Sequence, residues 1–328
     1  MTSSALVTGG AGFIGSSVAD RLLRLGYHVT TFDNFDPYYD PAQKRRNVSW
    51  ASSQPGYRLI EGDVRDRAAL AAAFDAARPD VVVHLAARAG VRASVEDPRS
   101  YVEVNELGGL NVLELCHERG NVPIAYASTS SVYGATQVIP FREDDPAAGP
   151  LSPYAASKRG AEMMVHAFHH LYQLPVAVLR FFTVYGPRGR PDMAFAIFTR
   201  KLLAGEPVRL HGEETARDFT FVEDIADGVL GAVNWVREKP RLDTFNLGRT
   251  EPVRVRRLIE LLADALGVSP TVELGQLGAS ETLVTSADVS KAHAAFGYAP
   301  KVDLTQGVRR WVEWIASDEA PPELRSRG

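Results

Sequence analysis

A tyrosine and a lysine four residues apart are the side chains whose types and spacing best suit catalysis. Tyr154 and Lys158 share one face if the segment between them is helical. A lysine ammonium lowers the pKa of a neighbouring phenol, and the phenolate can then take a proton from an alcohol. The hydroxyl of Thr129 is expected to hydrogen-bond the same alcohol. Taken alone, the pair fits an ordinary solvated helix face equally well.

A glycine-rich loop near the start of the chain predicts a dinucleotide site. Gly9, Gly12 and Gly15 follow an apolar, strand-like run in the spacing G-x-x-G-x-x-G. The first glycine permits a tight turn, the second lets the backbone approach a pyrophosphate, and the third lets a helix pack on the sheet. The helix that begins near Phe13 and Ile14 would offer free N–H groups and a partial positive charge to the phosphates.

An acidic residue follows the loop at the distance that a dinucleotide site requires. Asp33 lies 18 residues beyond Gly15, beside Asn34, at the end of the next predicted strand. Its carboxylate would accept hydrogen bonds from ribose hydroxyls and repel a 2′-phosphate, which favours NAD over NADP. The alternative is that the two residues only start a turn. The basic run 44–46 blurs this choice slightly, but it is expected to lie beyond a long loop.

The ends of the next two predicted strands complete the expected cofactor site. Asp63 and Val64 follow the third strand and would bracket an adenine. Leu85, Ala86 and Ala87 follow the fourth strand, and they include small residues that let a cofactor pass close to the backbone. The carboxyl ends of parallel strands share one edge of the sheet, where ligands bind in this architecture.

The elements that must position these residues alternate between strands and helices. Predicted strands span residues 5–8, 28–32, 57–61, 81–85, 124–128 and 176–181, with helices at 13–25, 67–77, 100–119 and 154–172. Near-continuous apolar strands indicate a parallel sheet covered on both faces. The sequence therefore predicts an α/β fold with a doubly wound parallel Rossmann sheet, the NAD-binding domain, over residues 1–185.

A smaller C-terminal α/β domain, which binds the substrate, is predicted over residues 186–320, with chain crossovers between the two domains. Its expected elements are strand pieces at 208–210 and 219–221 and helices at 223–236, 255–266 and 304–315. The tail at 321–328 is expected to be flexible.

Composition excludes several classes of partner. The 328 residues are 45% hydrophobic with a formal charge of −4, which gives no electrostatic reason to bind nucleic acid or an anionic membrane. Cys116 is the only cysteine, so no internal disulfide forms, and a buried thiol in a reducing compartment is expected. Neither a signal peptide nor an apolar run of membrane-spanning length is evident. We therefore expect a cytoplasmic protein.

Six motifs together resemble the extended short-chain dehydrogenase/reductase family of nucleotide-sugar enzymes. In chain order they read TGGAGFIGS, HLAA, ASTSSVYG, YAASK, RFFTVYGP and RDFTFVEDIA. The resemblance covers nearly the whole chain and implies a tightly held, recycled NAD. It also implies a homodimer built on a helical bundle, with the predicted helices 100–119 and 154–172 at the interface.

Two serines help to discriminate among the reactions of that family. Related sugar 4,6-dehydratases carry an Asp-Glu pair at the place of Ser130 and Ser131, and UDP-glucuronate decarboxylases carry a glutamate that resembles Ser131. Serine hydroxyls do not titrate in the range needed for elimination of water. This favours simple 4-epimerisation through a transient 4-keto sugar, with decarboxylation kept as an alternative.

Longer stretches resemble the UDP-glucuronate 4-epimerases. They read DNFDPYYDPAQKR, AGVRASVEDP and RFFTVYGPRGRPDMA. The resemblance places the substrate carboxylate against Arg190, Ser130, Ser131 and Thr183. At the position of Thr183, UDP-glucose 4-epimerases usually carry asparagine. A guanidinium can bind a carboxylate through two parallel hydrogen bonds. Arg188 competes for this role, and Arg92 is a weaker candidate for an anion contact.

The resemblance also assigns contacts to UDP. Arg217 resembles the arginine that binds the diphosphate, and the strand with Val208 and Leu210 resembles the one beside the uracil. Segment 277–282 departs from the Pro-Gly-Asp turn of the relatives. A UDP-glucose or UDP-N-acetylglucosamine 4-epimerase therefore remains an alternative.

Three further interpretations complete the set. A NAD-binding regulator would bind without turnover, although such proteins tend to lose the Tyr-Lys pair. A plain alcohol dehydrogenase would release its cofactor in each cycle. The histidines at 166, 169 and 170 lie on the catalytic helix at spacings that can bind a metal. Hydride chemistry needs no metal, so no metal site is predicted.

Overall fold

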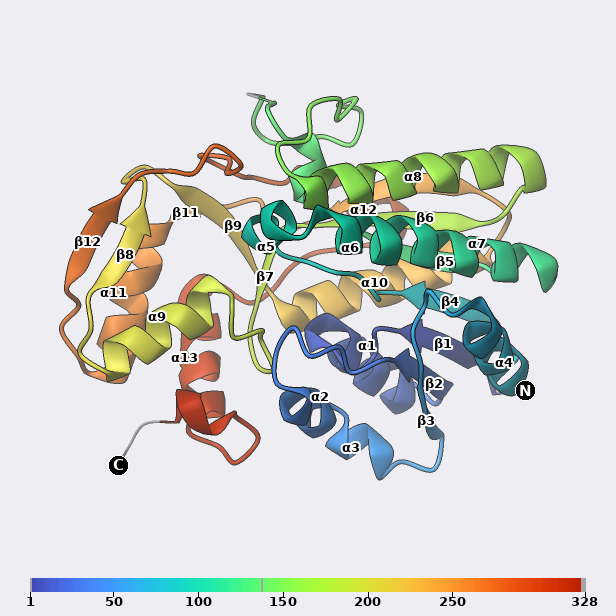
Figure 1. The fold of residues 1–328 in the computed structure, drawn as a ribbon, viewed down its shortest axis with the longest axis horizontal. Helices are drawn as coiled ribbons and strands as arrows, with labels where there is room; N and C mark the ends of the chain where they lie inside the picture. The colour runs from blue at the N-terminus through green and yellow to red at the C-terminus, as the bar shows by residue number, and fades with distance from the viewer. Residues whose placement is uncertain (1, 137, 326–328) are drawn as a thin grey trace.

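The computed structural model describes residues 2–136 and 138–325. Its largest element is a seven-stranded sheet in the order β10-β6-β5-β4-β1-β2-β3, in which neighbouring strands are parallel (Figure 1). The strands are β1 Ser4–Thr8, β2 His28–Asp33, β3 Tyr57–Glu61, β4 Val81–His84, β5 Ile124–Thr129, β6 Val176–Phe181 and β10 Leu242–Leu247. The predicted fold class is confirmed, and the six predicted strands lie within one residue of their expected ends.

Helices cover both faces of this sheet because its strands are apolar on both sides. One face packs against α1 Phe13–Arg24 and α10 Val222–Arg237. The other packs against α4 Arg67–Ala77, α7 Gly108–Glu118 and α8 Pro153–Tyr172. All residues of β4 are buried, as expected for a strand in the middle of such a sheet.

The single helix predicted at 100–119 is wrong, because a π-helical turn interrupts it. The segment consists of α6 Pro98–Tyr101, the π turn η1 Val102–Leu107, and α7. The wider turn holds the buried side chain of Asn105, whose amide bonds both backbone groups of Arg88 and the hydroxyl of Ser157. Such turns are frequent at functional sites, and this one ties the β4 loop to the catalytic helix.

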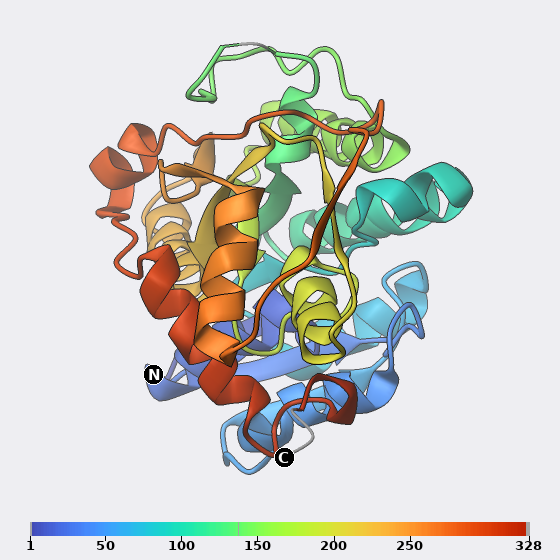
Figure 2. The same ribbon diagram turned by 90° about the vertical axis from the view of Figure 1, so that its left-hand side faces the viewer.

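The smaller part of the molecule has its own sheets and core. A three-stranded sheet has the order β11-β9-β7 and a two-stranded sheet pairs β12 with β8. Their bounds are β7 Thr183–Tyr185, β8 Val208–His211, β9 Ala216–Phe221, β11 Pro252–Arg254 and β12 Val272–Gly275. The helices α9 Ala194–Leu203, α11 Val255–Leu266 and α13 Leu304–Ile315 pack on them, and α11 and α13 lie side by side (Figure 2).

The chain passes between the two parts more than once. After β9 it returns through α10 and β10 to the large sheet, where β10 pairs with β6. The helix α12 Ser290–Phe296 then packs on α10. Shorter elements are α2 Pro41–Asn47, α3 Ser49–Ser52, α5 Val91–Glu96 and the 3-10 turns η2 Ser130–Tyr133 and η3 Pro322–Leu324.

The prediction of a flexible tail from residue 321 is wrong for its first part. Ala320 and Leu324 are fully buried in the core of the smaller part, and η3 lies between them. Apolar side chains hold this turn, whereas the prediction weighed only its position near the chain end. Residues 326–328 of the predicted tail lie outside the described residues. No described helix combines the length and apolar composition that crossing a bilayer requires.

Candidate active site

A cavity at the carboxyl edge of the large sheet gathers the residues predicted to contact a dinucleotide. We call it the first cavity. The loops after β1, β2, β3 and β4 line it, together with the start of α8. The predicted residues among its lining are Gly9, Gly12, Phe13, Ile14, Gly15, Asp33, Asn34, Asp63, Val64, Leu85, Ala86, Ala87, Tyr154 and Lys158.

The glycine loop is packed too tightly for any larger residue. Gly9 has φ +70°, and a Cβ there would lie 2.6 Å from the backbone nitrogen of Ala86. A Cβ at Gly15 would lie 2.1 Å from the carbonyl oxygen of Gly9. Gly12 precedes the first turn of α1, whose N-terminus therefore faces the cavity. This cradle fits a pyrophosphate.

The carboxylate of Asp33 holds the loop around this cradle. Its two oxygens accept hydrogen bonds from the backbone N–H groups of Ala11 and Phe35, at 3.0 and 2.9 Å. A carboxylate has about four acceptor positions, so it can still receive ribose hydroxyls. Asp63 is fixed in a similar way by Arg65 and Asn34, and the hydrogen bonds from Arg65 lower its pKa to about 2.

Lys44 corrects the expectation that the basic run lies away from the cofactor site. Asp40 caps α2, and the helix brings Lys44 into the lining of the first cavity. Its ammonium donates to the carbonyl of Asp36 at 3.0 Å, and burial lowers its pKa. The expectation rested on distance along the chain, whereas α2 folds back over the end of β2.

The catalytic pair lies where α8 begins. Ser152 caps the helix by accepting from the N–H of Ala155 at 3.1 Å, and Tyr154 and Lys158 face the first cavity one turn apart. Lys158 is 2% exposed, and burial lowers its pKa to about 8. Within the described residues its ammonium has no hydrogen-bond partner. Its ammonium lies 5.6 Å from the centre of the Tyr126 ring, and its hydrogen-bond donors fit a ribose or phosphate group of a dinucleotide.

The charge environment of Tyr154 differs from the prediction. Burial raises the pKa of Tyr154, and a hydrogen bond with Thr129 and the positive charge of Arg190 oppose that rise. Lys158 is not among the groups that shift the pKa of Tyr154, so the predicted lowering of that pKa by the lysine is not found. The hydroxyl of Thr129 donates to that of Ser131 at 3.2 Å, and its expected hydrogen bond to a substrate alcohol stays a prediction.

The carboxylate of Glu162 is buried on α8, one helical turn after Lys158. Glu162 is 1% exposed. It accepts hydrogen bonds from Ser128 at 2.6 Å, from Arg180 at 3.0 and 2.8 Å, and from Arg159 at 2.8 Å. Glu162 is also the group that opposes the fall of the Lys158 pKa. The sequence pattern did not predict this network, because its members are far apart in the chain.

The loop between β7 and α9 separates the roles of its two arginines. Arg188 is bound to Asp20 of α1 at 2.8 Å and anchors the loop. Arg190 lines the first cavity instead, and it pairs with both carboxylate oxygens of Asp192, at 2.9 and 2.6 Å. The predicted two-bond clamp of Arg190 on a substrate carboxylate stays a prediction, and it would require these two donors to leave Asp192. Its Nη1 has no partner among the described residues.

A second cavity gathers most of the predicted substrate residues. Ser130, Ser131, Thr183 and Arg217 all line it, although they come from η2, β7 and β9. Thr129 is not among the lining residues, but its hydroxyl accepts a hydrogen bond from the N–H of the lining residue Ser131 at 3.1 Å.

Arg217 is suited to bind an anion in this cavity. Its Nη1 donates to the carbonyls of Ala216 and Leu283, at 2.9 and 3.0 Å. Burial lowers the pKa of its guanidinium, and the charge of Glu281 opposes that effect. A guanidinium held by carbonyls retains its positive charge for an incoming phosphate.

Glu281 is a lining residue that the sequence motifs did not single out. It is the one acidic side chain that the described residues contribute to the second cavity. Arg92, itself 64% exposed, binds it at 2.7 Å. The predicted anion contact of Arg92 is thus made to a protein carboxylate.

Val208 and Leu210 are wrong as side-chain contacts to a ligand. They are 0% and 1% exposed and belong to the core of the smaller part. Strand alternation directs Arg209 outward between them.

The fold and the two cavities define a dinucleotide-dependent enzyme that acts on a hydroxyl group. The chain matches the NAD dependent epimerase/dehydratase family over residues 5–248 and belongs to that family. It is 42% identical to UDP-glucuronate 4-epimerase 1 of Arabidopsis thaliana, over 96% of this chain and 77% of that protein.

Two solved structures extend the comparison. UDP-glucuronic acid 4-epimerase from Bacillus cereus, in complex with UDP-glucuronic acid and NAD, has a TM-score of 0.87 at 33% identity, covering 94% of this chain and 98% of that one. UDP-glucose 4-epimerase from Thermus thermophilus, in complex with NAD, has a TM-score of 0.83 at 34% identity with the same coverage. The cofactor of this enzyme is NAD.

Proposed function

We propose that the protein is a UDP-glucuronate 4-epimerase, which interconverts UDP-glucuronate and UDP-galacturonate through a transient 4-keto sugar. The observation that carries this proposal is the second cavity, which has hydroxyls at Ser130 and Ser131 and no free acid among its described lining residues. Its acidic lining residue, Glu281, is paired with Arg92. The UDP-glucuronate 4-epimerases to which the chain is similar support the same reaction.

Tyr154 is the proposed base, and Thr129 assists it. The phenol oxygen takes the proton of the hydroxyl on sugar carbon 4, while the Thr129 hydroxyl, which contacts Tyr154, orients that oxygen. The glycine loop and Asp33 would hold NAD, which would supply the hydride acceptor for carbon 4 and the hydride donor for the ketone, and Tyr154 would return its proton to the sugar oxygen. Lys158 would contact the cofactor in the first cavity, and in the second cavity the acidic side chain among the described lining residues, Glu281, is paired with Arg92.

The hydroxyls of Ser130, Ser131 and Thr183 are the proposed contacts of the sugar carboxylate. All three line the second cavity, and hydroxyl donors can coordinate a carboxylate. Arg190 contributes charge and its free Nη1, rather than a two-bond clamp. Arg217 is the proposed contact of the UDP diphosphate.

A second copy of this chain is the proposed partner, and the cytoplasm the proposed location. Exposed apolar side chains lie along η1 and α8, namely Val102, Leu107, Met163, Met164 and Leu171. Pairing these helices across a two-fold axis would remove that surface from water, as helical bundles do. The buried, unpaired Cys116 supports a reducing compartment. Sedimentation of the purified protein tests the dimer.

Proton NMR of UDP-glucuronate incubated with the purified protein, without added NAD, tests the reaction. The expected result is UDP-galacturonate with no net change in absorbance. A pentose product would instead indicate a decarboxylase, and a stalled reaction an alcohol dehydrogenase. No reaction with any UDP-sugar would indicate a NAD-binding regulator. Faster turnover of UDP-glucose or UDP-N-acetylglucosamine would overturn the proposed sugar.

A further inference from the structure

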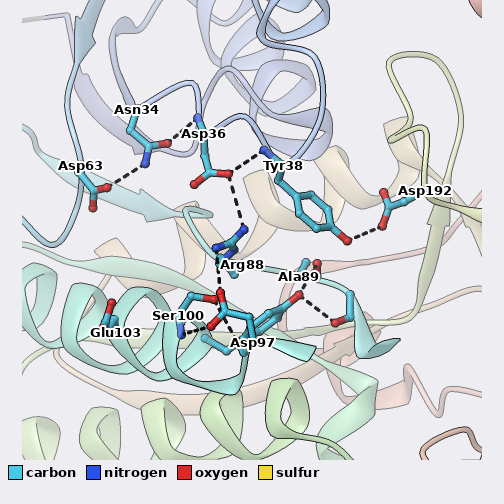
Figure 3. A network of polar contacts seen from close by, with 12 residues as sticks. Asn34, Asp36, Tyr38, Asp63, Arg88, Ala89, Asp97, Ser100, Glu103 and Asp192 are labelled. Atoms are coloured by element: carbon cyan, nitrogen blue, oxygen red, sulfur yellow. Dashed lines mark hydrogen bonds and ion pairs between the residues drawn. The ribbon is translucent and has the colours of Figure 1, made fainter. Parts of the chain in front are cut away.

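Three loops from distant parts of the chain meet over the first cavity. The loop after β2 carries Tyr38, the loop after β4 carries Ala89, and the loop between β7 and α9 carries Asp192 (Figure 3). The last of these loops also carries Arg190. The Tyr38 hydroxyl donates to Asp192 Oδ2 at 3.0 Å. Arg190 binds the same carboxylate and also donates to the carbonyl of Ala89 at 3.4 Å. One carboxylate thus connects all three loops.

The ring of Tyr38 fills the space between two cations. The guanidinium carbons of Arg88 and Arg190 lie 5.7 and 5.6 Å from the centre of the ring, within the range of cation–π attraction. Gly90 has φ +120°, and a Cβ there would lie 2.9 Å from the Tyr38 hydroxyl. Burial and the Asp192 carboxylate raise the pKa of Tyr38, so the phenol stays protonated and remains a donor.

The base of the β2 loop is fixed to the sheet. Asn34 donates to Asp63 Oδ2 at 2.9 Å, and it accepts from the N–H of Asp36 at 2.9 Å (Figure 3). Asp36 in turn accepts from the N–H of Tyr38 at 2.8 Å and lies 3.9 Å from Arg88. Tyr38 therefore stands at the end of a chain of contacts that begins at the adenosine end of the cavity.

The base of the third loop is fixed as well. Gln43 donates to the carbonyl of Gly189 at 2.9 Å, and Arg188 binds Asp20 at 2.8 Å. Gln43 thus joins the segment after β2 to the third loop at one point, and the bond between Tyr38 and Asp192 joins them a second time, beside Arg190, which lines the first cavity.

We propose that Tyr38 and Asp192 form a clasp that retains NAD through successive turnovers. An epimerase must return the hydride to the same substrate, so loss of the cofactor in mid-cycle would strand a ketone. Tyr38 and the glycine loop both line the first cavity, so the clasp and the loop would act on the same bound dinucleotide. Asp192 also fixes Arg190, whose charge acts on Tyr154, so closure completes the electrostatic environment of the base. This inference rests on the assignment of NAD to the first cavity.

Exchange of bound NAD tests the clasp without relying on turnover. Holoenzyme loaded with radiolabelled NAD is mixed with excess unlabelled NAD, and the loss of protein-bound label gives the dissociation rate. Tyr38→Phe removes one hydroxyl, and Asp192→Asn removes one charge. Because a hydrogen bond to a charged group is lost, we expect about tenfold faster exchange in each single variant. The double variant should release NAD at the same rate as the single variant that releases it faster, because both changes break the same hydrogen bond.

Matched controls separate the clasp from general destabilisation. Tyr27→Phe loses a hydroxyl that Arg237 contacts before the start of β2, away from the cavity. Asp75→Asn removes the negative charge of a side chain on α4 that Arg119 contacts. Both should exchange NAD at the wild-type rate. Exchange at the wild-type rate in Tyr38→Phe overturns the clasp alone, as does equally faster exchange in the controls. A wild-type protein that binds no NAD overturns the assignment of the cavity together with the clasp.

Discussion

The two cavities of this enzyme are assembled in different ways. The first is formed mainly by consecutive strand ends of one parallel sheet, so the spacing of a few motifs defines it. The second combines η2, the start of α8, two strands of the three-stranded sheet (β7 and β9) and the loop residues 280–285. The order of strands in one sheet is therefore enough to form the cofactor site. The substrate site depends in addition on how the smaller part of the molecule packs against the large sheet. Variants in one cavity should therefore leave binding in the other intact.

Tyr154→Phe should have the largest effect, because Tyr154 is the proposed base between the two ligands. Loss of the hydroxyl is expected to lower kcat by about 10²–10⁴-fold, with NAD and UDP still bound. Rates come from NMR, and binding of each ligand from calorimetry. A variant with near wild-type kcat would remove the tyrosine from the mechanism.

Arg217→Ala should act on the second cavity alone. Removal of a charge-assisted contact to the diphosphate is expected to raise KM for the UDP-sugar by about 10- to 100-fold. Exchange of bound NAD should keep the wild-type rate. Weaker NAD retention in this variant would contradict the separation of the two cavities.

A change of pH should act on the first cavity alone. The pKa of Lys158, lowered to about 8 by burial, means that the side chain is charged below this pH and neutral above it. Binding of NAD to cofactor-free protein should therefore weaken as the pH rises through about 8, by up to about tenfold per pH unit. Titrations across this range measure the effect. In Lys158→Met the same titration should be flat, whatever the affinity.

Arg92→Ala should have the smallest effect, because this side chain is mostly exposed. Loss of an exposed ion pair with Glu281 is expected to change the free energy of unfolding by less than about 1 kcal/mol. KM for the UDP-sugar should change less than in Arg217→Ala. A larger increase in KM would place Arg92, rather than Arg217, as the main diphosphate contact. Urea unfolding and initial rates give both quantities.

Sequence patterns predicted the large sheet because its strands and helices are determined by short, contiguous stretches of sequence. Apolar runs of strand length, separated by amphipathic helices, determine the boundaries, and the loops after them meet at one edge. Gly9, Gly15 and Asp33 followed directly from these rules. The π turn at 102–107 was not predictable in this way, because the buried polar contacts of Asn105 override the regular helical period.

Other errors arose where tertiary contacts choose among equivalent candidates. Val208 and Leu210 alternate with Arg209, and the sequence could not say which face of the strand meets a ligand. The sequence also did not show that Asp192, two residues after Arg190, accepts from its donors. The proximity of Lys44 to the cofactor site required knowing that α2 folds back over β2.

The pairing of β10 with β6 also bears on how the protein is made. During synthesis, β6 leaves the ribosome well before β10, so one edge of the growing sheet stays open until residue 247 has emerged. Open sheet edges invite pairing with other chains. A shortened chain that ends after residue 185 would keep that edge permanently and also lack α10, which covers apolar residues of the sheet. Residues 1–185 should therefore aggregate when they are expressed alone. A shortened protein designed to bind NAD would have to include the chain at least through β10.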